Sequence, residues 1–148
     1  NQLIGINAEK TSDHAVHQAI TEAFKQLEVE LVYYTVMADI DISPGRYVFF
    51  VEVNNWEEID KAEVEELLES KLCLANPRYE KFRKVMKIGH LSLEIVKPHT
   101  FDSLKALLLS GGASRNQVKI PRVVKKDELI EFLKSNTCDT KVEEFVGV

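Results

Sequence analysis

The 148-residue sequence predicts a single α+β domain, in which a small mixed or antiparallel sheet is flanked by helices. Hydrophobic residues make up 45% of the chain, which is enough for an ordinary hydrophobic core. Segments with apolar residues three or four positions apart alternate with short segments rich in β-branched and aromatic residues. The sequence has no internal repeat, low-complexity run or linker, so we expect residues 1–148 to form one domain.

The N-terminal part is expected to form a short strand over Leu3–Asn7 and then a helix over about residues 12–28. Apolar side chains recur along one side of this helix, and the Thr11-Ser12-Asp13 run supplies oxygen atoms that can cap its first N–H groups. Two strands should follow, over Leu31–Met37 and Tyr47–Val53. Because a Ser-Pro-Gly turn lies between them, they are expected to pair antiparallel.

The remainder of the chain is predicted from the same periodicities. Proline is favoured in the first turn of a helix, threonine caps helices, and glycine ends them. An acidic helix is predicted from Asp60 to about Cys73, with a core face of Val64, Leu67, Leu68 and Leu72, and a second helix from Pro77 to Met86. A strand over Leu91–Val96 follows, and then a helix that is capped by Thr100, ends at Gly111-Gly112 and faces inward with Leu104, Leu107 and Leu108. The last predicted elements are a helix over Lys126–Ser135 and a strand over Lys141–Val146. The acidic run from Glu57 to Glu69 is interpreted as a solvated helix face.

Composition and charge argue against several classes of function. The net charge of −5 gives no basic field over the whole protein, so nucleic acid is not an expected partner. No apolar run approaches the roughly 18–20 residues that a membrane span needs, and no signal peptide is visible. The chain does not start with Met, so we interpret it as a fragment or processed form of a longer protein.

Cysteine and histidine residues show no pattern of a disulfide or metal site. Cys73 and Cys138 are far apart in the sequence, which argues against a disulfide scaffold or zinc knuckle and fits a reducing cytoplasm. We expect Cys73 to be a small core residue and Cys138 to be an exposed thiol. His14 and His17 lie about one helical turn apart without a third candidate ligand, so no metal site is expected.

One basic segment departs from the acidic character of the chain. Its cations follow the small residues Gly111-Gly112-Ala113-Ser114, which let a backbone approach a ligand closely. Fixed cations next to such a run suit phosphate, although the segment is not a P-loop because Lys119 is followed by Ile120. A solvated basic loop and a phosphate site both stay open from the residues alone. The cations are Arg115, Lys119, Arg122, Lys125 and Lys126.

Several motifs that lie in the same order along the chain resemble those of one enzyme family. The segment from Gly112 to Arg122 is similar to the motif Gly-Ala-Ser-x-Asn-Gln-Tyr-Lys-x-Pro-Arg. The other matches are Lys10-Thr11 with Asp13, Tyr34-Thr35 with Ala38-Asp39, Pro44-Gly45-Arg46-Tyr47-Val48, Leu93-Glu94-Ile95 and Thr100-Phe101-Asp102. Together they resemble the C-terminal domain of the acyl-acid amido synthetases, which belong to the adenylate-forming superfamily.

The resemblance implies that residues 1–148 are the mobile C-terminal lid of an ATP-dependent ligase. Such an enzyme adenylates a carboxylic acid and then transfers the acyl group to an amine, in this family an amino acid. The implied partners are an N-terminal adenylation domain of the same chain, a small-molecule carboxylic acid and an amine. The implied cofactor is ATP with Mg²⁺ in the full-length enzyme, with none bound by this domain alone. The isolated domain is expected to be inactive and the enzyme to be cytoplasmic, without membrane contact.

The resemblance also implies roles for individual residues. Lys119 is the implied catalytic residue, because it would lie between the substrate carboxylate and the α-phosphate while these two anions meet. The residues implied to bind nucleotide or phosphate are Lys10, Ser114, Asn116, Gln117 and Arg122. Of these, Lys10 would contact AMP in a second orientation of the lid, and Arg122 would either hold the loop or pair with phosphate.

Two positions depart from the family pattern. Gly111 stands where the family commonly has Arg, and Val118 stands where it has Tyr, so a cation and a ring that would orient the loop are missing. A second hypothesis, from a different class, is a stand-alone phosphate- or RNA-binding module that uses the basic loop 115–126. Aromatic residues are missing from that loop, which argues against stacking on single-stranded RNA.

Overall fold

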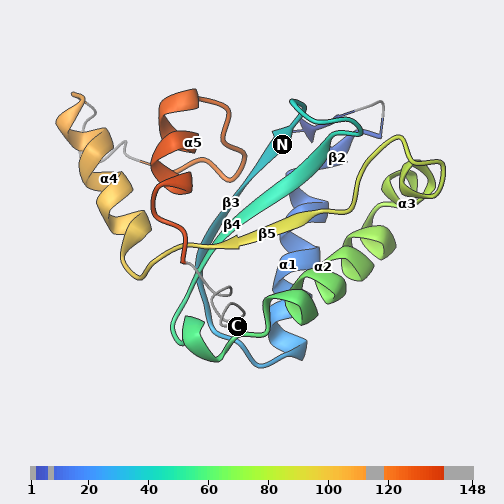
Figure 1. Cartoon of the computed structure of the whole chain (residues 1–148), viewed down its shortest axis with the longest axis horizontal. Helices are drawn as coiled ribbons and strands as arrows, with labels where there is room; N and C mark the ends of the chain where they lie inside the picture. Colours follow the sequence, from blue (N-terminus) through green and yellow to red (C-terminus); the bar gives the residue numbers. More distant parts are fainter. Residues whose placement is uncertain (1–2, 7–8, 113–118, 139–148) are drawn as a thin grey trace, which may run out of the picture.

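The computed structural model describes residues 3–6, 9–112 and 119–138 (Figure 1). The elements in these ranges are β1 (Leu3–Ile4), β2 (Thr11–Ser12), α1 (Asp13–Gln26), β3 (Leu31–Asp39), β4 (Arg46–Val53), a 3₁₀ turn η1 (Trp56–Glu58), α2 (Lys61–Ala75), α3 (Pro77–Lys84), β5 (Ser92–Ile95), α4 (Thr100–Ser110) and α5 (Asp127–Lys134). The predicted elements within these ranges are confirmed, with shifts of a few residues at their ends. The strand predicted over Lys141–Val146 lies outside the described residues.

The central sheet has three strands in the order β3-β4-β5. β3 and β4 pair antiparallel, with Val36 opposite Phe49, and β4 and β5 pair parallel, with Phe49 opposite Leu93. β1 and β2 form a separate antiparallel pair of two residues each. The sheet is therefore mixed, and the predicted α+β class is confirmed.

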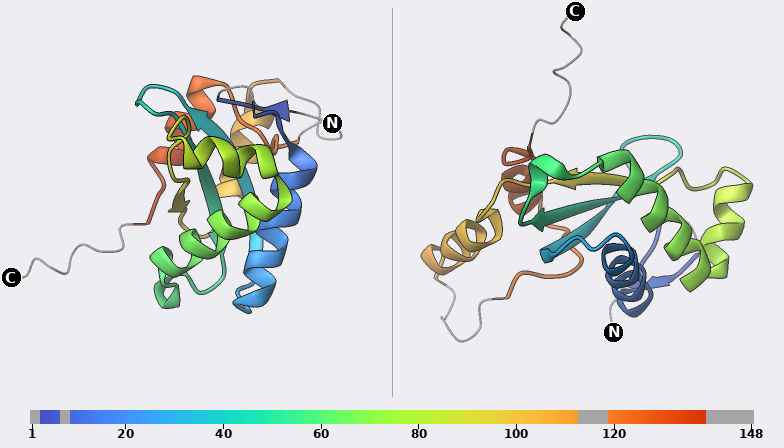
Figure 2. Two further views of the ribbon diagram at one scale, coloured as in Figure 1. Left: turned by 90° about the vertical axis from the view of Figure 1, so that its right-hand side faces the viewer. Right: turned by 90° about the horizontal axis from the view of Figure 1, so that it is seen from below.

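Helices cover both faces of this sheet. Figures 1 and 2 show α1, α2 and α3 on one side of it and α4 and α5 on the other. Side chains alternate between the two faces along β4: Phe49 and Val51 join the core under α1 and α2, whereas Val48 and Phe50 join the core under α4 and α5. Burial on both faces explains why β4 reads as a nearly continuous apolar run.

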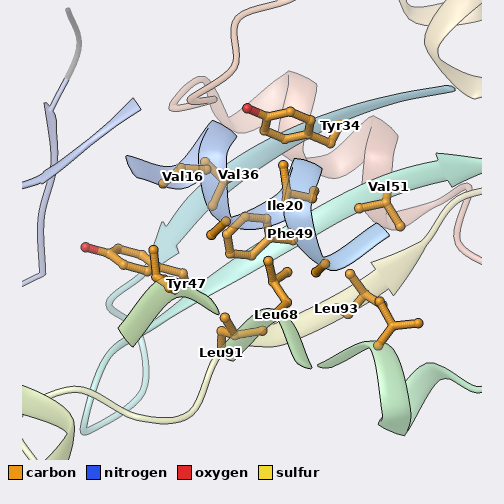
Figure 3. Packing of buried hydrophobic residues seen from close by; sticks show 14 of the residues in the cluster. Val16, Ile20, Tyr34, Val36, Tyr47, Phe49, Val51, Leu68, Leu91 and Leu93 are labelled. Atoms are coloured by element: carbon orange, nitrogen blue, oxygen red, sulfur yellow. The ribbon is translucent and has the colours of Figure 1, made fainter. Parts of the chain in front are cut away.

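The described residues form one hydrophobic core on each face of the sheet. In the first core, Phe49 is fully buried at the centre of the sheet, with Ile20 of α1 and Leu68 of α2 packed around it (Figure 3). The second core lies between the sheet, α4 and α5, and includes Leu104 and Leu133, both fully buried. The described part of the chain thus has its own hydrophobic interior on each side of the sheet.

Local side-chain caps set the starts of α1 and α2, and the sequence predicts the first of them from the Thr11-Ser12-Asp13 run. The Ser12 hydroxyl accepts a hydrogen bond from the Ala15 amide at 3.1 Å, and the Asp60 carboxylate accepts one from the Glu63 amide at 3.2 Å. Pro77 occupies the first turn of α3, which follows directly after α2. These caps satisfy N–H groups that a helix leaves without internal partners.

The start of α4 is capped by a side chain from β4, which corrects the prediction for Thr100. The Glu52 carboxylate accepts hydrogen bonds from the amides of His99 at 2.8 Å and Phe101 at 3.0 Å. Thr100 is the first residue of the helix, and its hydroxyl donates to the Lys97 carbonyl at 2.6 Å. A carboxylate at a helix N-terminus is also favoured by the helix dipole, so Glu52 ties α4 to the sheet.

Replacing Glu52 with Ala is expected to lower the free energy of unfolding by about 2–4 kcal/mol, because two amides lose a charged acceptor. The Thr100→Ala variant removes one neutral hydrogen bond and should lose about 1 kcal/mol. Urea unfolding of the chain, followed by circular dichroism, measures both values. Equal losses for the two variants would contradict the assignment of Glu52 as the cap.

Glu65 and Glu69 of the acidic run bind groups in the protein interior, so the prediction of a solvated face is wrong for these two residues. Glu69 is only 8% exposed; its carboxylate accepts a hydrogen bond from the Tyr79 hydroxyl at 2.8 Å and pairs with Arg83. The Glu65 carboxylate accepts a hydrogen bond from the Leu93 amide at 2.7 Å. The charge pattern alone does not reveal these partners, which α3 and β5 bring to the helix from later in the chain.

Two further expectations are corrected. Leu107 was expected to face inward but is 45% exposed, whereas Leu104 carries the buried side of α4. Cys138 is half-buried against the first core and is not an exposed thiol. Burial raises the pKa of Cys138 to about 11, so its thiol stays protonated near neutral pH.

None of the helices in the described residues combines the length and apolar character that a membrane crossing requires.

Candidate functional site

The C-terminal half of the basic segment runs along the free edge of β3. The Val36 amide donates to the Arg122 carbonyl at 2.8 Å, and the Val124 amide donates to the Val36 carbonyl at 2.9 Å. These two bonds form a parallel bridge between Val36 and Val123, which extends the sheet by one short contact. The sequence predicts only an irregular loop here, because the pairing depends on residues far away in the chain.

Side chains fix the same segment further. The Tyr33 hydroxyl donates to the Ile120 carbonyl at 2.7 Å, and the Thr35 hydroxyl donates to the Pro121 carbonyl at 2.6 Å. The side chain of Ile120 is 4% exposed and packs into the second core. Residues 120–124 are therefore held by backbone bonds, side-chain bonds and apolar burial together.

Lys119 stands at the start of this anchored segment. Its side chain is exposed, and it forms no hydrogen bond or ion pair with another residue in the described ranges. The next residue, Ile120, is buried, so the backbone that carries Lys119 is held against the sheet. A solvated ammonium group on a fixed backbone is suited to meet an anion that comes from outside the domain.

The Arg122 side chain, in contrast, contacts other side chains of the domain. Its guanidinium carbon lies 4.5 Å from the centre of the Tyr34 ring and 5.0 Å from that of Tyr33. Its Nη1 donates to His17 Nδ1 at 3.0 Å, and the Tyr34 hydroxyl lies 3.1 Å from the same His17 nitrogen. Burial disfavours the charged form of Arg122, but its interactions with Tyr33 and Tyr34 outweigh this effect and raise the pKa of Arg122.

Lys10 also combines an exposed side chain with an anchored backbone. Its φ of 55° lies in the left-handed region, which costs a non-glycine residue some strain. On either side, Glu9 and Thr11 are fully buried; the Tyr47 hydroxyl donates to the Glu9 carboxylate, and its oxygen lies within hydrogen-bond distance of Thr11 Oγ1, at 3.0 Å. The Asn76 amide also donates to Thr11 Oγ1, at 2.8 Å. Lys10 therefore projects from a rigid polar cluster directly before α1.

A cavity of about 500 Å³ adjoins the basic segment. It lies between the end of β3 and the start of α5, and its charged lining comprises Asp39, Asp41, Lys125 and Asp127. The described residues contain no group of three or more His, Cys, Asp or Glu side chains arranged to hold a metal ion.

The predicted site is described in part. Lys10, Lys119 and Arg122 are described, whereas Ser114, Asn116 and Gln117 lie outside the described residues. Sequence reasoning missed the contribution of His17 and Tyr33 to the surroundings of Arg122. Tyr34-Thr35 was matched as a motif, but nothing in that motif identifies residues 120–122 as its partners.

Comparison with known proteins identifies the family. The model of the GH3 family C-terminal domain matches residues 14–128. The indole-3-acetic acid-amido synthetase GH3.5 of Arabidopsis thaliana is 35% identical, over 95% of this chain and 24% of the relative. The jasmonoyl-L-amino acid synthetase JAR6 of Nicotiana attenuata is 33% identical, over 96% of this chain and 25% of the relative.

A solved structure agrees with these sequence matches. The GH3.15 acyl acid amido synthetase superposes with a TM-score of 0.84 at 30% identity, over 93% of this chain and 26% of that one. The chain spans about a quarter of the length of the curated relatives it matches. The comparisons give no support to a stand-alone phosphate- or RNA-binding module. Since the family model covers most of its length, the chain belongs to the GH3 family and represents the C-terminal domain of that family.

Proposed function

We propose that this domain is the mobile lid of an ATP-dependent acyl-acid amido synthetase. The enzyme adenylates a carboxylic acid and then transfers the acyl group to the amine of an amino acid. The proposal rests on one observation. The Lys119 side chain is exposed and has no partner among the described residues, and it lies on a segment that is hydrogen-bonded to the sheet. Membership of the GH3 family supports the class of reaction, because relatives of this chain are named as amido synthetases.

The Lys119 ammonium group would act in the adenylation step. In the first half-reaction a carboxylate oxygen attacks the α-phosphorus of ATP, an acyl-adenylate forms and pyrophosphate leaves. Two anions must come together, and negative charge builds up between them. A charge pair at ~4 Å is worth about 1 kcal/mol in bulk water and about 4 kcal/mol at an effective dielectric constant near 20. The Lys119 ammonium is therefore most effective when closure of the lid excludes water.

The exposed cations fit the phosphate part of ATP. Lys119 and Lys10 both present ammonium groups from anchored backbones, and neither lines the 500 Å³ cavity beside the basic segment or the pocket of about 440 Å³ beside Arg122. When bound, ATP with Mg²⁺ supplies an electrophilic phosphorus and a good leaving group. We therefore assign the pockets for ATP and the acyl acid to an N-terminal adenylation domain, and we expect this domain alone to bind neither.

We propose that Lys10 acts in the second half-reaction, the transfer of the acyl group to the amine. The amine attacks the acyl carbon and AMP leaves, and a lid that has turned about its N-terminal end would bring Lys10, not Lys119, towards the AMP phosphate. The buried Glu9 and Thr11 would keep the Lys10 backbone fixed while neighbouring segments turn. We place the enzyme in the cytoplasm, where reduced thiols at Cys73 and Cys138 are stable.

ATP–pyrophosphate exchange tests the proposal on the intact gene product. A panel of aliphatic, indolic and benzoic carboxylic acids is offered with ATP and Mg²⁺, and exchange should require one class of acid. The 148-residue chain alone should give no exchange with any of them. The proposal fails if the intact protein is inactive with the whole panel and instead binds single-stranded RNA with a strong dependence on salt.

A further inference from the structure

We propose that Arg122 is a positioning residue that holds Lys119 in place, and that it does not itself bind phosphate. It acts together with Tyr33, Tyr34 and His17, and we call these four residues the Arg122 clasp. The inference rests on the proposed function of Lys119. It assigns to the sheet edge a role in catalysis that the motif around Arg122 does not reveal.

The Arg122 guanidinium already contacts side chains of this domain. It lies against the faces of Tyr34 and Tyr33 at 4.5 and 5.0 Å, within the range of cation–π attraction. One of its N–H groups donates to His17, whose ring stacks on Tyr34 with 6.0 Å between the ring centres. An arginine that reaches out for phosphate would have to leave these contacts, whereas Lys119 has none to leave among the described residues.

The clasp residues also hold the backbone between Arg122 and Lys119. Tyr33 contacts the guanidinium with its ring and binds the Ile120 carbonyl with its hydroxyl. The Arg122 carbonyl accepts the Val36 amide, so backbone and side chain of Arg122 are both fixed to β3. Ile120 directly follows Lys119, and a shift of this short segment would therefore move the ammonium group.

Displacement of Lys119 should affect the chemical step more than substrate binding. A misplacement of about 1 Å can cost as much as 10²-fold in rate. The Arg122→Gln variant of the full-length protein should therefore lower the maximal rate of ATP–pyrophosphate exchange by roughly 10-fold, with little change in the KM for ATP. A residue that binds phosphate directly would raise that KM.

A double-mutant cycle with Lys119→Ala tests the inference. If Arg122 acts through Lys119, Arg122→Gln should lower exchange in the wild-type background and have no further effect in the Lys119→Ala background. Multiplicative losses would show that Arg122 acts independently and would overturn the inference. Arg78→Gln on the exposed surface of α3 is the matched control and should leave exchange unchanged.

A second variant keeps the test valid if Arg122→Gln does not fold. Tyr33→Phe removes only the hydroxyl that binds the Ile120 carbonyl and keeps the ring against the guanidinium. It should lower exchange several-fold, again only when Lys119 is present. If Lys119→Ala itself leaves exchange unchanged, the proposed function fails. If Lys119→Ala is impaired but Tyr33→Phe and Arg122→Gln are not, only the clasp is refuted.

Discussion

Replacing Lys119 with Ala in the full-length protein is expected to lower ATP–pyrophosphate exchange by roughly 10²–10³-fold, the usual effect of removing one preorganised charge-stabilising group. The side chain is exposed, and its backbone is fixed by the buried Ile120 and by the segment paired with β3. Removal of the ammonium should therefore leave the fold intact and act on the rate alone. Initial rates of exchange at saturating ATP and acid measure the effect.

Lys126→Ala is the matched control for this substitution. Lys126 is an exposed lysine of the same basic segment and precedes α5. Its removal changes the net charge by the same amount but removes no group assigned to catalysis, so exchange should stay within about twofold of wild type. Equal losses in both variants would indicate that general positive charge, not the position of Lys119, supports the reaction.

Replacing Phe49 with Ala is expected to lower the free energy of unfolding by about 3–5 kcal/mol, the typical cost of deleting a buried aromatic ring. Phe49 is fully buried on the central strand, opposite Val36 on one side and Leu93 on the other. Ile20 and Leu68 pack over it from α1 and α2, so the cavity would lie where three strands and two helices meet (Figure 3). Urea unfolding of the 148-residue chain measures the loss.

Val32→Ala provides the comparison for Phe49→Ala. Val32 lies on β3 of the same sheet but is 47% exposed, so its truncation should cost less than about 1 kcal/mol. The Phe49→Leu variant fills part of the cavity and remains measurable if Phe49→Ala does not fold. A loss for Phe49→Leu as small as that for Val32→Ala would contradict the central position of Phe49 in the first core.

The elements that the sequence predicts well depend on nearby residues. The cap of α1 comes from Ser12, three residues before the amide that it binds, so a short window contains the whole signal. The β3–β4 pair likewise follows from two apolar strands joined by a turn at Pro44 and Gly45. Periodicity and turn chemistry act over such short distances, and they were sufficient for the order of elements and the fold class.

The features that sequence reasoning missed depend on partners far away in the chain. The α4 cap is supplied by Glu52, which lies 47 residues before His99, whereas the local sequence pattern predicts Thr100. The hydroxyl of Tyr33 reaches a carbonyl 87 residues later, and no local pattern predicts that bond. The cations of the site were found because their clustering is visible in the sequence, but the anchoring that distinguishes Lys119 from Arg122 required the three-dimensional structure.

Separate assay of the two half-reactions distinguishes a role of Lys119 in adenylation from a general role in the enzyme. Wild-type and Lys119→Ala full-length proteins are compared in ATP–pyrophosphate exchange and in transfer from a preformed acyl-adenylate to an amino acid. We predict that Lys119→Ala loses exchange by at least roughly 10²-fold and keeps transfer close to the wild-type rate, since Lys119 serves only the first chemical step. Equal losses in both half-reactions, or exchange at the wild-type rate, would contradict this prediction.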